Sequence, residues 1–315
     1  MYDVRPTRQL LAEGYTNAEL AQLSKKGELE RVRRGAYGPP ATETLDALGR
    51  QHRLVHATLQ YLADDAVVSH ASAAALHGLT LYATRLDRVQ VTRCDRPGGK
   101  ARALTNTHAA PLDDSEIVLI DGMAVTSLAR TVADLSRAVP FASAVVTGDS
   151  SLRMGLDRAE LIACLQRMRR WPGVVRARRV AAFIDGRSES PGESRSRAAF
   201  MQCGLPAPEP QFEVFDNDAR FVGRVDSAWP ALRTIGEFDG KIKYGRSLWE
   251  VQDSHDVVFR EKLREDALRD LGWQVVRWTW SDLDRSNDIV AKLRRAFARA
   301  RPASTFRTLT PAHLP

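Results

Sequence analysis

Four acidic residues in the last third of the chain have the spacing of a divalent-cation site. Glu193 begins a predicted helix, Asp226 lies near the end of a predicted strand, and Glu237 and Asp239 lie two apart in the next predicted strand. Residues two apart in a strand share one face of the sheet. Carboxylate oxygens are the ligands that Mg²⁺ prefers, and such an ion polarises a phosphate and lowers the pKa of an attacking water. The expected chemistry is hydrolysis of a phosphodiester bond, with Mg²⁺ or Mn²⁺ held by Glu193, Asp226 and Glu237 and with Asp239 as a further ligand.

Two lysines follow these acids and supply a positive charge. Lys241 and Lys243 lie two and four residues beyond Asp239. Either could stabilise the pentacovalent phosphate or position the water. The expected catalytic set is therefore Glu193, Asp226, Glu237, Asp239, Lys241 and Lys243.

Ion pairing is the alternative use of the same acids. Carboxylates among apolar strand residues are costly to bury unless they are paired or metal-bound. The candidate partners are Arg195, Arg197, Arg224 and Lys262. On the following helix, Glu261 and Arg264 lie three apart and predict an ion pair on the helix surface. A network of ion pairs between Asp226 and Glu237 would favour a protein without catalytic activity.

The elements that position these acids follow a recognisable order. Hydrophobic periodicity predicts a helix over 193–204, strands over 210–216, 221–230 and 233–240, a helix over 257–272, a strand over 273–280 and a helix over 288–300. Helix, three-strand meander, helix, strand and helix is the core order of the PD-(D/E)XK nuclease fold, which this region resembles.

The N-terminal segment predicts a second kind of site. Thr16, three residues before Glu19, is the expected N-cap of a helix that follows a shorter helix and a turn. Residues 28–38 alternate as a hairpin around Gly35, with arginines beside the turn. This is the order of a winged helix-turn-helix, whose basic side chains would reach a phosphate backbone; a solvated helix face is the alternative. The candidate DNA-binding residues are Thr16, Lys25, Lys26, Arg31, Arg33 and Arg34.

The middle of the chain predicts a mixed α+β block. Strands are expected near 66–70, 86–94 and 116–127, the last turning at Asp121–Gly122, and an amphipathic helix over 128–139. His70 and His77 lie about two helical turns apart, and Asp134 is a third candidate ligand. We favour a capping histidine and a histidine at the edge of the core over a metal or catalytic site.

An arginine-rich connector follows this block. Residues 167–187 carry seven arginines and one aspartate. A helix is expected with Val174, Val175, Val180, Ala181 and Phe183 on one side. The arginines on the other side, Arg176, Arg178 and Arg179 among them, would bridge domains or lie along a phosphate backbone, unless they form a solvated face.

Phrases of the first half resemble a known family. Residues 8–38, 67–79 and 122–139 are similar in order and spacing to the AbiEi-type antitoxins, which are transcriptional autorepressors of toxin–antitoxin systems. The resemblance covers about residues 5–165. It implies DNA binding through residues 16–26 and 31–34, and as partners DNA and either a toxin or a second copy of the chain.

Phrases of the last third resemble another group. Residues 192–197, 204–211, 223–230, 235–245 and 261–280 are similar to the nuclease-like domain related to very-short-patch-repair endonucleases. The resemblance implies Glu193, Asp226 and Glu237 as the metal-binding acids. The lysine of the family's motif, two positions after Glu237, is replaced here by Asp239. Glu261, Lys262, Arg264 and Arg277 also match, and the resemblance implies that they orient the acids or a phosphate.

Composition narrows the class of protein. The chain has 315 residues, 43% of them hydrophobic, which excludes a disordered chain. Its net charge of +7 favours a polyanionic partner. The three cysteines are far apart and lack metal-ligand spacing, which favours a reducing compartment. Because no run approaches about 18 apolar residues, we expect a cytoplasmic location and no membrane partner.

We therefore predict an α+β multidomain protein. The expected parts are a winged helix-turn-helix over 1–40, an AbiEi-like α+β domain over 41–166, the connector over 167–189, an α/β PD-(D/E)XK nuclease-like domain over 190–300 and a tail over 301–315. The leading hypothesis is a DNA-binding protein with a metal-dependent deoxyribonuclease domain. The alternative is a non-catalytic repressor whose nuclease-fold domain binds DNA or a partner. A nuclease for RNA or structured DNA is a third hypothesis.

Overall fold

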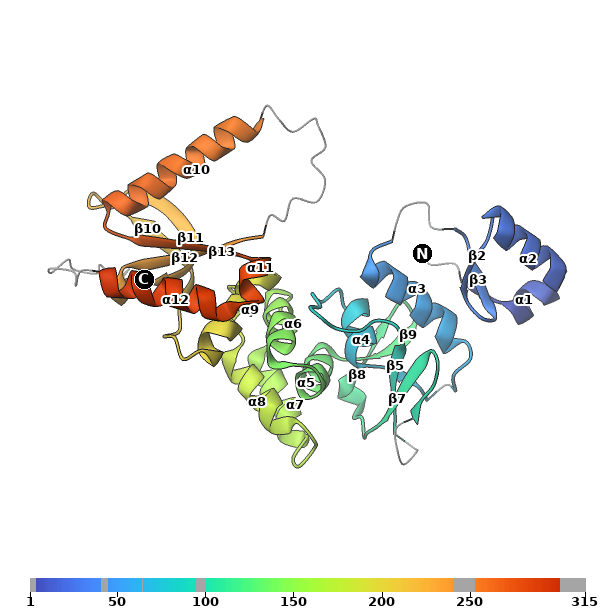
Figure 1. Cartoon of the computed structure of the whole chain (residues 1–315). Helices are drawn as coiled ribbons and strands as arrows, with labels where there is room; N and C mark the ends of the chain where they lie inside the picture. Colours follow the sequence, from blue (N-terminus) through green and yellow to red (C-terminus); the bar gives the residue numbers. More distant parts are fainter. Residues whose placement is uncertain (1–3, 41–44, 64, 95–99, 241–252, 301–315) are drawn as a thin grey trace, which may run out of the picture. The chain divides into compact units, whose positions relative to one another are not determined.

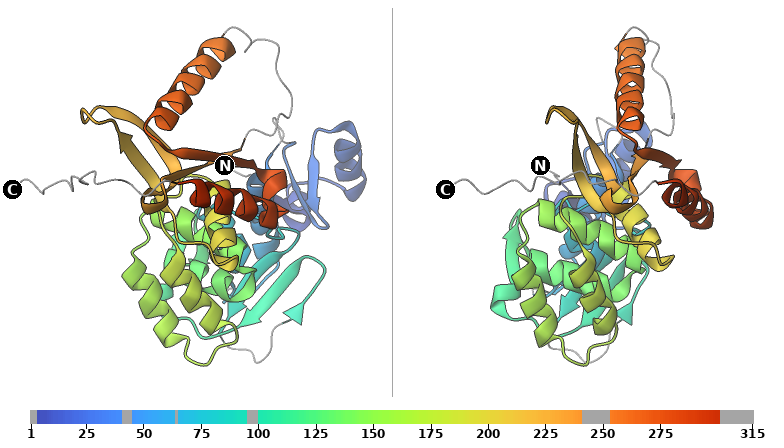
Figure 2. Two further views of the ribbon diagram at one scale, coloured as in Figure 1. Left: turned by 60° about the vertical axis from the view of Figure 1, so that its left-hand side comes forward. Right: turned by 90° about the vertical axis from the view of Figure 1, so that its left-hand side faces the viewer.

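The computed structural model describes residues 4–40, 45–63, 65–94, 100–240 and 253–300. The chain divides into two compact units, Met1–Gly186 and Arg187–Pro315. Both combine helices with β-strands, so the prediction of a mixed α+β chain is confirmed (Figures 1 and 2). Over the described ranges, no helix has both the length and the apolar character that crossing a bilayer requires.

The first unit begins with a small helical and β-hairpin motif. Its elements are β1 (Arg5–Pro6), α1 (Thr7–Ala12), α2 (Asn17–Lys26), β2 (Glu30–Arg33) and β3 (Ala36–Gly38). These described strands pair antiparallel in the order β1-β3-β2. The predicted capping box is confirmed, because the Thr16 hydroxyl accepts from the Glu19 amide at 3.2 Å and the Glu19 carboxylate accepts from the Thr16 amide at 2.7 Å.

A larger sheet with helices makes up the rest of this unit. Its elements are α3 (Ala47–Leu59), β4 (Val67–Val68), α4 (His70–Leu76), β5 (Val89–Arg93), β6 (Lys100–Ala101), β7 (Thr105–Ala109), η1 (Asp114–Glu116), β8 (Ile117–Ile120), β9 (Met123–Thr126), α5 (Leu128–Ala138), α6 (Phe141–Arg153), α7 (Arg158–Arg167) and α8 (Val174–Phe183). The described strands form one sheet in the order β6-β7-β5-β4-β9-β8. Its core includes Val55 of α3 together with Val68, Val91 and Val125 of three neighbouring strands.

Helix α3 joins the hairpin motif to this sheet. Arg53 is 5% exposed, pairs with Glu30 of β2, and donates to the carbonyl of Pro39 at 2.7 Å. Just after α3, the Gln60 amide donates to the carbonyl of Val4 at 2.8 Å. The buried guanidinium therefore has polar partners on the hairpin, which offsets its loss of hydration.

Helix α8 packs against α5, α6 and α7 within the first unit. Val174, Ala177 and Val180 are buried at helical spacing, whereas Val175 is 71% exposed. The prediction that Val175 shares the apolar face is wrong, because at about 100° per residue Val174, Ala177, Val180 and Ala181 form one buried arc and Val175 lies on the opposite side of the helix.

The second unit is built on a mixed sheet. Its elements are α9 (Pro191–Gln202), β10 (Glu209–Phe215), β11 (Phe221–Trp229), η2 (Pro230–Leu232), β12 (Thr234–Asp239), α10 (Asp253–Asp270), β13 (Gln274–Thr279), α11 (Trp280–Leu283) and α12 (Ser286–Arg299). The described strands follow the order β10-β11-β12-β13, antiparallel except that β13 runs parallel to β12. Helix, meander, helix, strand and helix is the predicted order; the short α11 was not predicted. Phe200, Trp229 and Trp278 lie at the centre of its main core.

Candidate functional site

Two of the predicted acids lie opposite each other on the neighbouring strands β11 and β12. Ser227 pairs with Gly236, so Asp226 and Glu237 occupy the next positions along the two strands. The Phe238 amide donates to the Asp226 carboxylate at 2.8 Å. Both acids line an open pocket of about 400 Å³, which we call the acidic pocket; its other lining residues are Arg224, Phe238, Asp239, Gly240, Glu261, Arg264 and Arg277.

Glu193 is held in the first turn of α9 by two donors. It is 7% exposed, and its Oε2 accepts from the Glu189 amide at 2.9 Å and from the Gln211 side-chain amide at 2.9 Å. Gln211 has φ +53°, a left-handed conformation that is uncommon for this residue type and concentrates at functional sites. Gln211 could not be predicted from the sequence, because its conformation and its contact with α9 leave no local signal.

The remaining predicted residues of this set differ in placement. Asp239 is exposed at the end of β12 and lies on the rim of the pocket. Lys241 and Lys243 lie outside the described residues.

Two arginines bind Glu237 from different elements. Its Oε1 accepts from Arg264 of α10 at 2.7 Å, and its Oε2 from Arg277 of β13 at 2.8 Å. Arg277 also pairs with Glu261 at 2.7 Å and with Glu265 at 3.1 Å. Both oxygens of Glu237 thus belong to a network of ion pairs that connects β12, β13 and α10.

Asp226 is largely buried and lies near two other acids, Glu193 and Glu237. Burial, reinforced by the charges of Glu193 and Glu237, raises the pKa of Asp226 to about 6, against the opposing effects of the Phe238 amide and Arg264. A carboxyl group whose pKa approaches neutrality in a pocket is a common feature of functional sites.

Asp226→Asn is expected to stabilise the second unit above pH 6. In the native protein Asp226 binds its proton up to about pH 6, whereas the unfolded carboxyl releases it near 3.8. Ionised Asp226 therefore destabilises the native state. This loss of stability is absent below pH 4, grows as the pH rises from 4 to 6, and reaches its full size above pH 6. At about 1.4 kcal/mol per pKa unit the gain is on the order of 1 to 3 kcal/mol at pH 7.5.

Chemical denaturation of both proteins at pH 4.5 and 7.5 measures this gain. Asp218→Asn is the matched control, because Asp218 lies in the exposed β10–β11 turn. A variant no more stable than wild type at pH 7.5 would contradict the cost that burial and the neighbouring acids impose on the Asp226 carboxylate.

The pocket meets a divalent cation's requirements only in part. Asp226 and Glu237 provide the oxygen donors that a hard cation prefers, whereas Glu193 acts on Asp226 through its charge and is not among the residues that line the pocket. Each oxygen of Glu237 already accepts from a guanidinium group, so a cation would compete with the charges of Arg264 and Arg277 for this carboxylate. The donor set fits in type, and the ion pairing opposes it.

The predicted DNA-binding residues of the first unit lie on α2 and the β2–β3 hairpin. Arg31 and Arg34 are exposed on the hairpin, and the Arg33 guanidinium lies over the Tyr61 ring at 4.9 Å. Lys25 and Lys26 are exposed in the last turn of α2. Thr16 is exposed at the start of α2, where its hydroxyl caps the helix. The hairpin and the end of α2 thus present cations to solvent.

The connector arginines make contacts within their own unit. Arg176 donates to the carbonyls of Ser136, at 3.3 Å, and of Arg137. Arg178 donates to the carbonyl of Leu165 at 3.5 Å, and Arg179 lies 5.8 Å from the Phe141 ring centre. These contacts help to fix α8 on its neighbouring helices.

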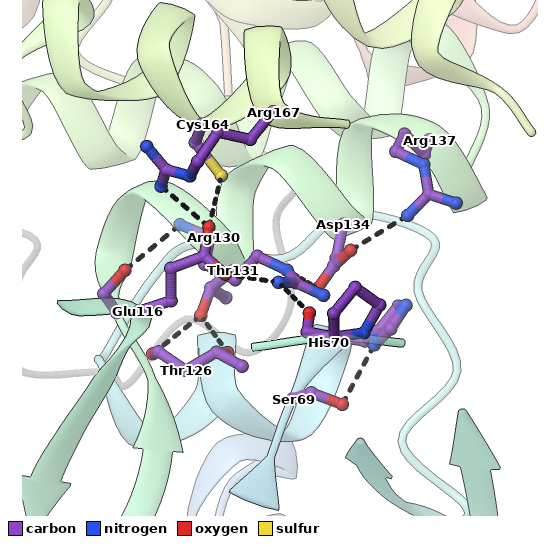
Figure 3. A network of polar contacts seen from close by, with 12 residues as sticks. Ser69, His70, Glu116, Thr126, Arg130, Thr131, Asp134, Arg137, Cys164 and Arg167 are labelled. Carbon is purple, nitrogen blue, oxygen red and sulfur yellow. Dashed lines mark hydrogen bonds and ion pairs between the residues drawn. The ribbon is translucent and has the colours of Figure 1, made fainter. Parts of the chain in front are cut away.

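A buried charge network occupies the middle of the first unit (Figure 3). Arg130 is 1% exposed and pairs with Glu116 at 2.6 Å and with Asp134 at 2.8 Å. Asp134 also accepts from Arg137 at 3.0 Å, and Glu116 from Arg167 at 2.8 Å. Asp134 therefore serves two arginines.

Electrostatics differ between the two acids of this network. Burial raises the pKa of Asp134 in spite of Arg130 and Arg137. Burial acts the same way on Glu116, but Arg167 and Arg130 outweigh it and lower the pKa of Glu116. Burial, with Glu116 adding to it, raises the pKa of the Cys164 thiol to about 12. Cys164 is accordingly a neutral thiol, which is a poor nucleophile.

The two histidines considered with Asp134 have separate partners. His70 is the first residue of α4, has φ +51°, lies 3.0 Å from the Ser69 hydroxyl and stacks on His108 with ring centres 3.7 Å apart. The Nε2 atom of His77 lies 2.8 Å from the carbonyl of Thr126.

The chain is similar to a family of regulators within its first 40 residues, to two relatives over most of its length, and to a solved structure. Residues 7–40 match the family described as "Transcriptional regulator, AbiEi antitoxin". The chain is 30% identical over 290 residues to two Mycobacterium tuberculosis proteins, uncharacterized protein MT2308 of strain CDC 1551 / Oshkosh and uncharacterized protein Rv2248 of strain H37Rv, with 91% of this chain and 99% of each relative covered. The crystal structure of the RV2827C protein from Mycobacterium tuberculosis is similar at a TM-score of 0.38 and 12% identity, over 69% of this chain and 84% of that chain.

Proposed function

This chain belongs to the same family as the Mycobacterium tuberculosis proteins MT2308 and Rv2248, and we propose that it is a DNA-binding transcriptional regulator of the AbiEi type. One observation carries the proposal. The match to the AbiEi regulators covers residues 7–40, the segment that contains α1, α2 and the hairpin with exposed Arg31 and Arg34. Basic side chains on a hairpin beside a short helix pair suit contact with the DNA backbone.

The second unit fits this role as a nuclease-fold domain that has become a binding module. The order from α9 to β13 and the convergence of Asp226 with Glu237 support the PD-(D/E)XK relationship. The binding of Glu237 by Arg264 and Arg277 supports a non-catalytic use, because the two guanidinium groups already neutralise the carboxylate charge that would attract a cation. Its partner would be DNA, a toxin or a second copy of the chain, in the cytoplasm.

Binding of the full-length chain to the DNA upstream of its own coding sequence tests the proposal. Fluorescence anisotropy with this duplex and with a shuffled duplex of equal length would be measured from 50 to 300 mM salt. We expect tighter binding to the upstream duplex and a linear fall of log K with log salt for both. Equal affinity for the two duplexes would reject a promoter-specific regulator.

Metal-dependent hydrolysis of a phosphodiester is a second candidate function. The raised pKa of Asp226 favours it, because a nearby cation would stabilise the anionic form of this carboxyl group, which burial and the charges of Glu193 and Glu237 disfavour. The test is incubation with Mg²⁺ or Mn²⁺ and with duplex DNA, single-stranded DNA and RNA. Cleavage that Asp226→Asn abolishes and Asp218→Asn retains would establish this function. If wild type cleaves no more than Asp226→Asn does, the hydrolytic function is rejected and the transcriptional regulator remains the proposed function.

A further inference from the structure

Two histidines of α3 and an aspartate of the β8–β9 turn form a cluster outside the sites described above. His52 and His56 lie one helical turn apart, with ring centres 6.2 Å apart and planes inclined by 40°. The carboxylate of Asp121 completes the group, in which one ligand atom from each residue lies within 4.8 Å of the other two. Both imidazoles are half-buried and Asp121 is exposed, so the cluster opens to solvent on one side.

The backbone brings Asp121 to α3 by a tight turn with an apolar base. Asp121 has φ +50° and Gly122 φ +76°, the two positive values that a two-residue type I′ hairpin requires. The flanking Ile120 and Met123 pack in the same core as Val55 of α3. Packing on both sides of the turn therefore holds the carboxylate beside the histidine pair.

The donor set is that of a borderline transition metal. Imidazole nitrogens with one carboxylate bind Zn²⁺ at about 2.0–2.2 Å, which places tetrahedral ligand atoms roughly 3.4 Å apart. The three ligand atoms lie within 4.8 Å of one another, so metal binding would draw them closer together, and Asp121 is the exposed member of the group. Burial lowers the pKa of both histidines, His56 further through its neighbour His52, while Asp121 opposes the shift; neutral imidazole is the metal-binding form.

We propose that His52, His56 and Asp121 bind a divalent transition metal of the zinc class, with a fourth position open to solvent. The metal would tie α3 to the β8–β9 hairpin and so stabilise the first unit by mass action. The site shares no ligand with the winged helix or the acidic pocket, so it stands or falls independently of the proposed function.

Titration calorimetry of the full-length chain with zinc chloride tests the site. A large excess of Mg²⁺ is present throughout to saturate any site made of carboxylates alone. We expect wild type to bind one equivalent of Zn²⁺. In Asp121→Asn and His56→Gln the affinity for Zn²⁺ is expected to fall at least about 100-fold, which exceeds the usual loss when a residue that only contacts a ligand is changed. Asp121→Asn is the variant safest for folding, because asparagine also adopts the left-handed turn conformation. His77→Gln, which alters a histidine on α4, is expected to bind as wild type.

Two results would overturn the proposal. One is a wild-type chain that binds no zinc, and the other is an Asp121→Asn variant with wild-type affinity. Cobalt substitution gives a second measurement, because Co²⁺ held by nitrogen and oxygen shows d–d absorption without a sulfur charge-transfer band. A sulfur band would assign the metal to a cysteine and overturn the site as well.

Discussion

Arg130→Met is expected to lower the free energy of unfolding of the first unit by about 3–5 kcal/mol. The guanidinium lies between the carboxylates of Glu116 and Asp134, and all three side chains are at most 6% exposed. Methionine fills much of the volume but leaves the carboxylates without their shared partner. Arg137 still reaches Asp134 and Arg167 still reaches Glu116, so the loss is expected to stay below that of two isolated buried charges.

Hydrogen exchange of the α5 amides against denaturant measures this loss. It reports on the first unit alone and needs no two-state assumption for the whole chain. Arg93→Met is the matched control, because its pair with Asp65 at 2.6 Å is partly exposed and is expected to contribute at most about 1 kcal/mol. Equal losses in the two variants would mean that burial does not set the importance of Arg130.

Arg31→Glu with Arg34→Glu is expected to weaken binding of the full-length chain to its upstream DNA on the order of 100-fold. Each arginine that neutralises a phosphate contributes about 0.9 to the slope of log K against log salt, so the slope is expected to decrease by about 2. Arg31 lies on β2 and Arg34 in the turn of the hairpin, and both side chains are exposed, so the change is expected to leave folding intact.

A charge-matched variant separates contact from overall charge. Arg85 and Arg102 are exposed in the same unit, away from the hairpin and α2, and Arg85→Glu with Arg102→Glu changes the net charge equally. Its affinity for DNA is expected to stay within about threefold of wild type, because salt at 0.1 M screens charges that lie more than about 10 Å from the DNA. If both double variants lost affinity equally, the hairpin would not be the DNA-binding surface. Arg178→Glu with Arg179→Glu, measured beside them, tests the connector.

Local signals in the sequence predicted most of the longer elements, whereas the short α11 and the strands β6 and β7 were not predicted. The Thr16 to Glu19 spacing predicted the start of α2, and Asp121–Gly122 predicted the β8–β9 turn. In the second unit, a change from helical to alternating periodicity predicted the order of helices and strands. These signals lie within a few residues of one another, so no tertiary information was needed.

Partners distant in sequence could not be predicted in the same way. The acids Asp226 and Glu237 were singled out by their places in strands, but the binding of Glu237 by Arg264 and Arg277 depends on how α10 and β13 return to the sheet. Arg130 and Asp134 have the four-residue spacing of a helix ion pair, whereas Glu116 reaches Arg130 only through the fold. His52 and His56 have a visible four-residue spacing, whereas Asp121 joins them only through the fold of the hairpin.

The anchoring of the hairpin on α3 limits how this protein can be divided or recombined. A fragment that ends at residue 40 would remove Arg53 from Glu30 and Pro39, and Gln60 from the carbonyl of Val4. Such a fragment would present its basic side chains on an unsupported backbone, at a high entropic cost. A chimera that exchanges the hairpin motif between relatives therefore has to transfer the chain through Gln60 as one block. Evolution by domain shuffling would meet the same boundary, after α3 and not after the hairpin.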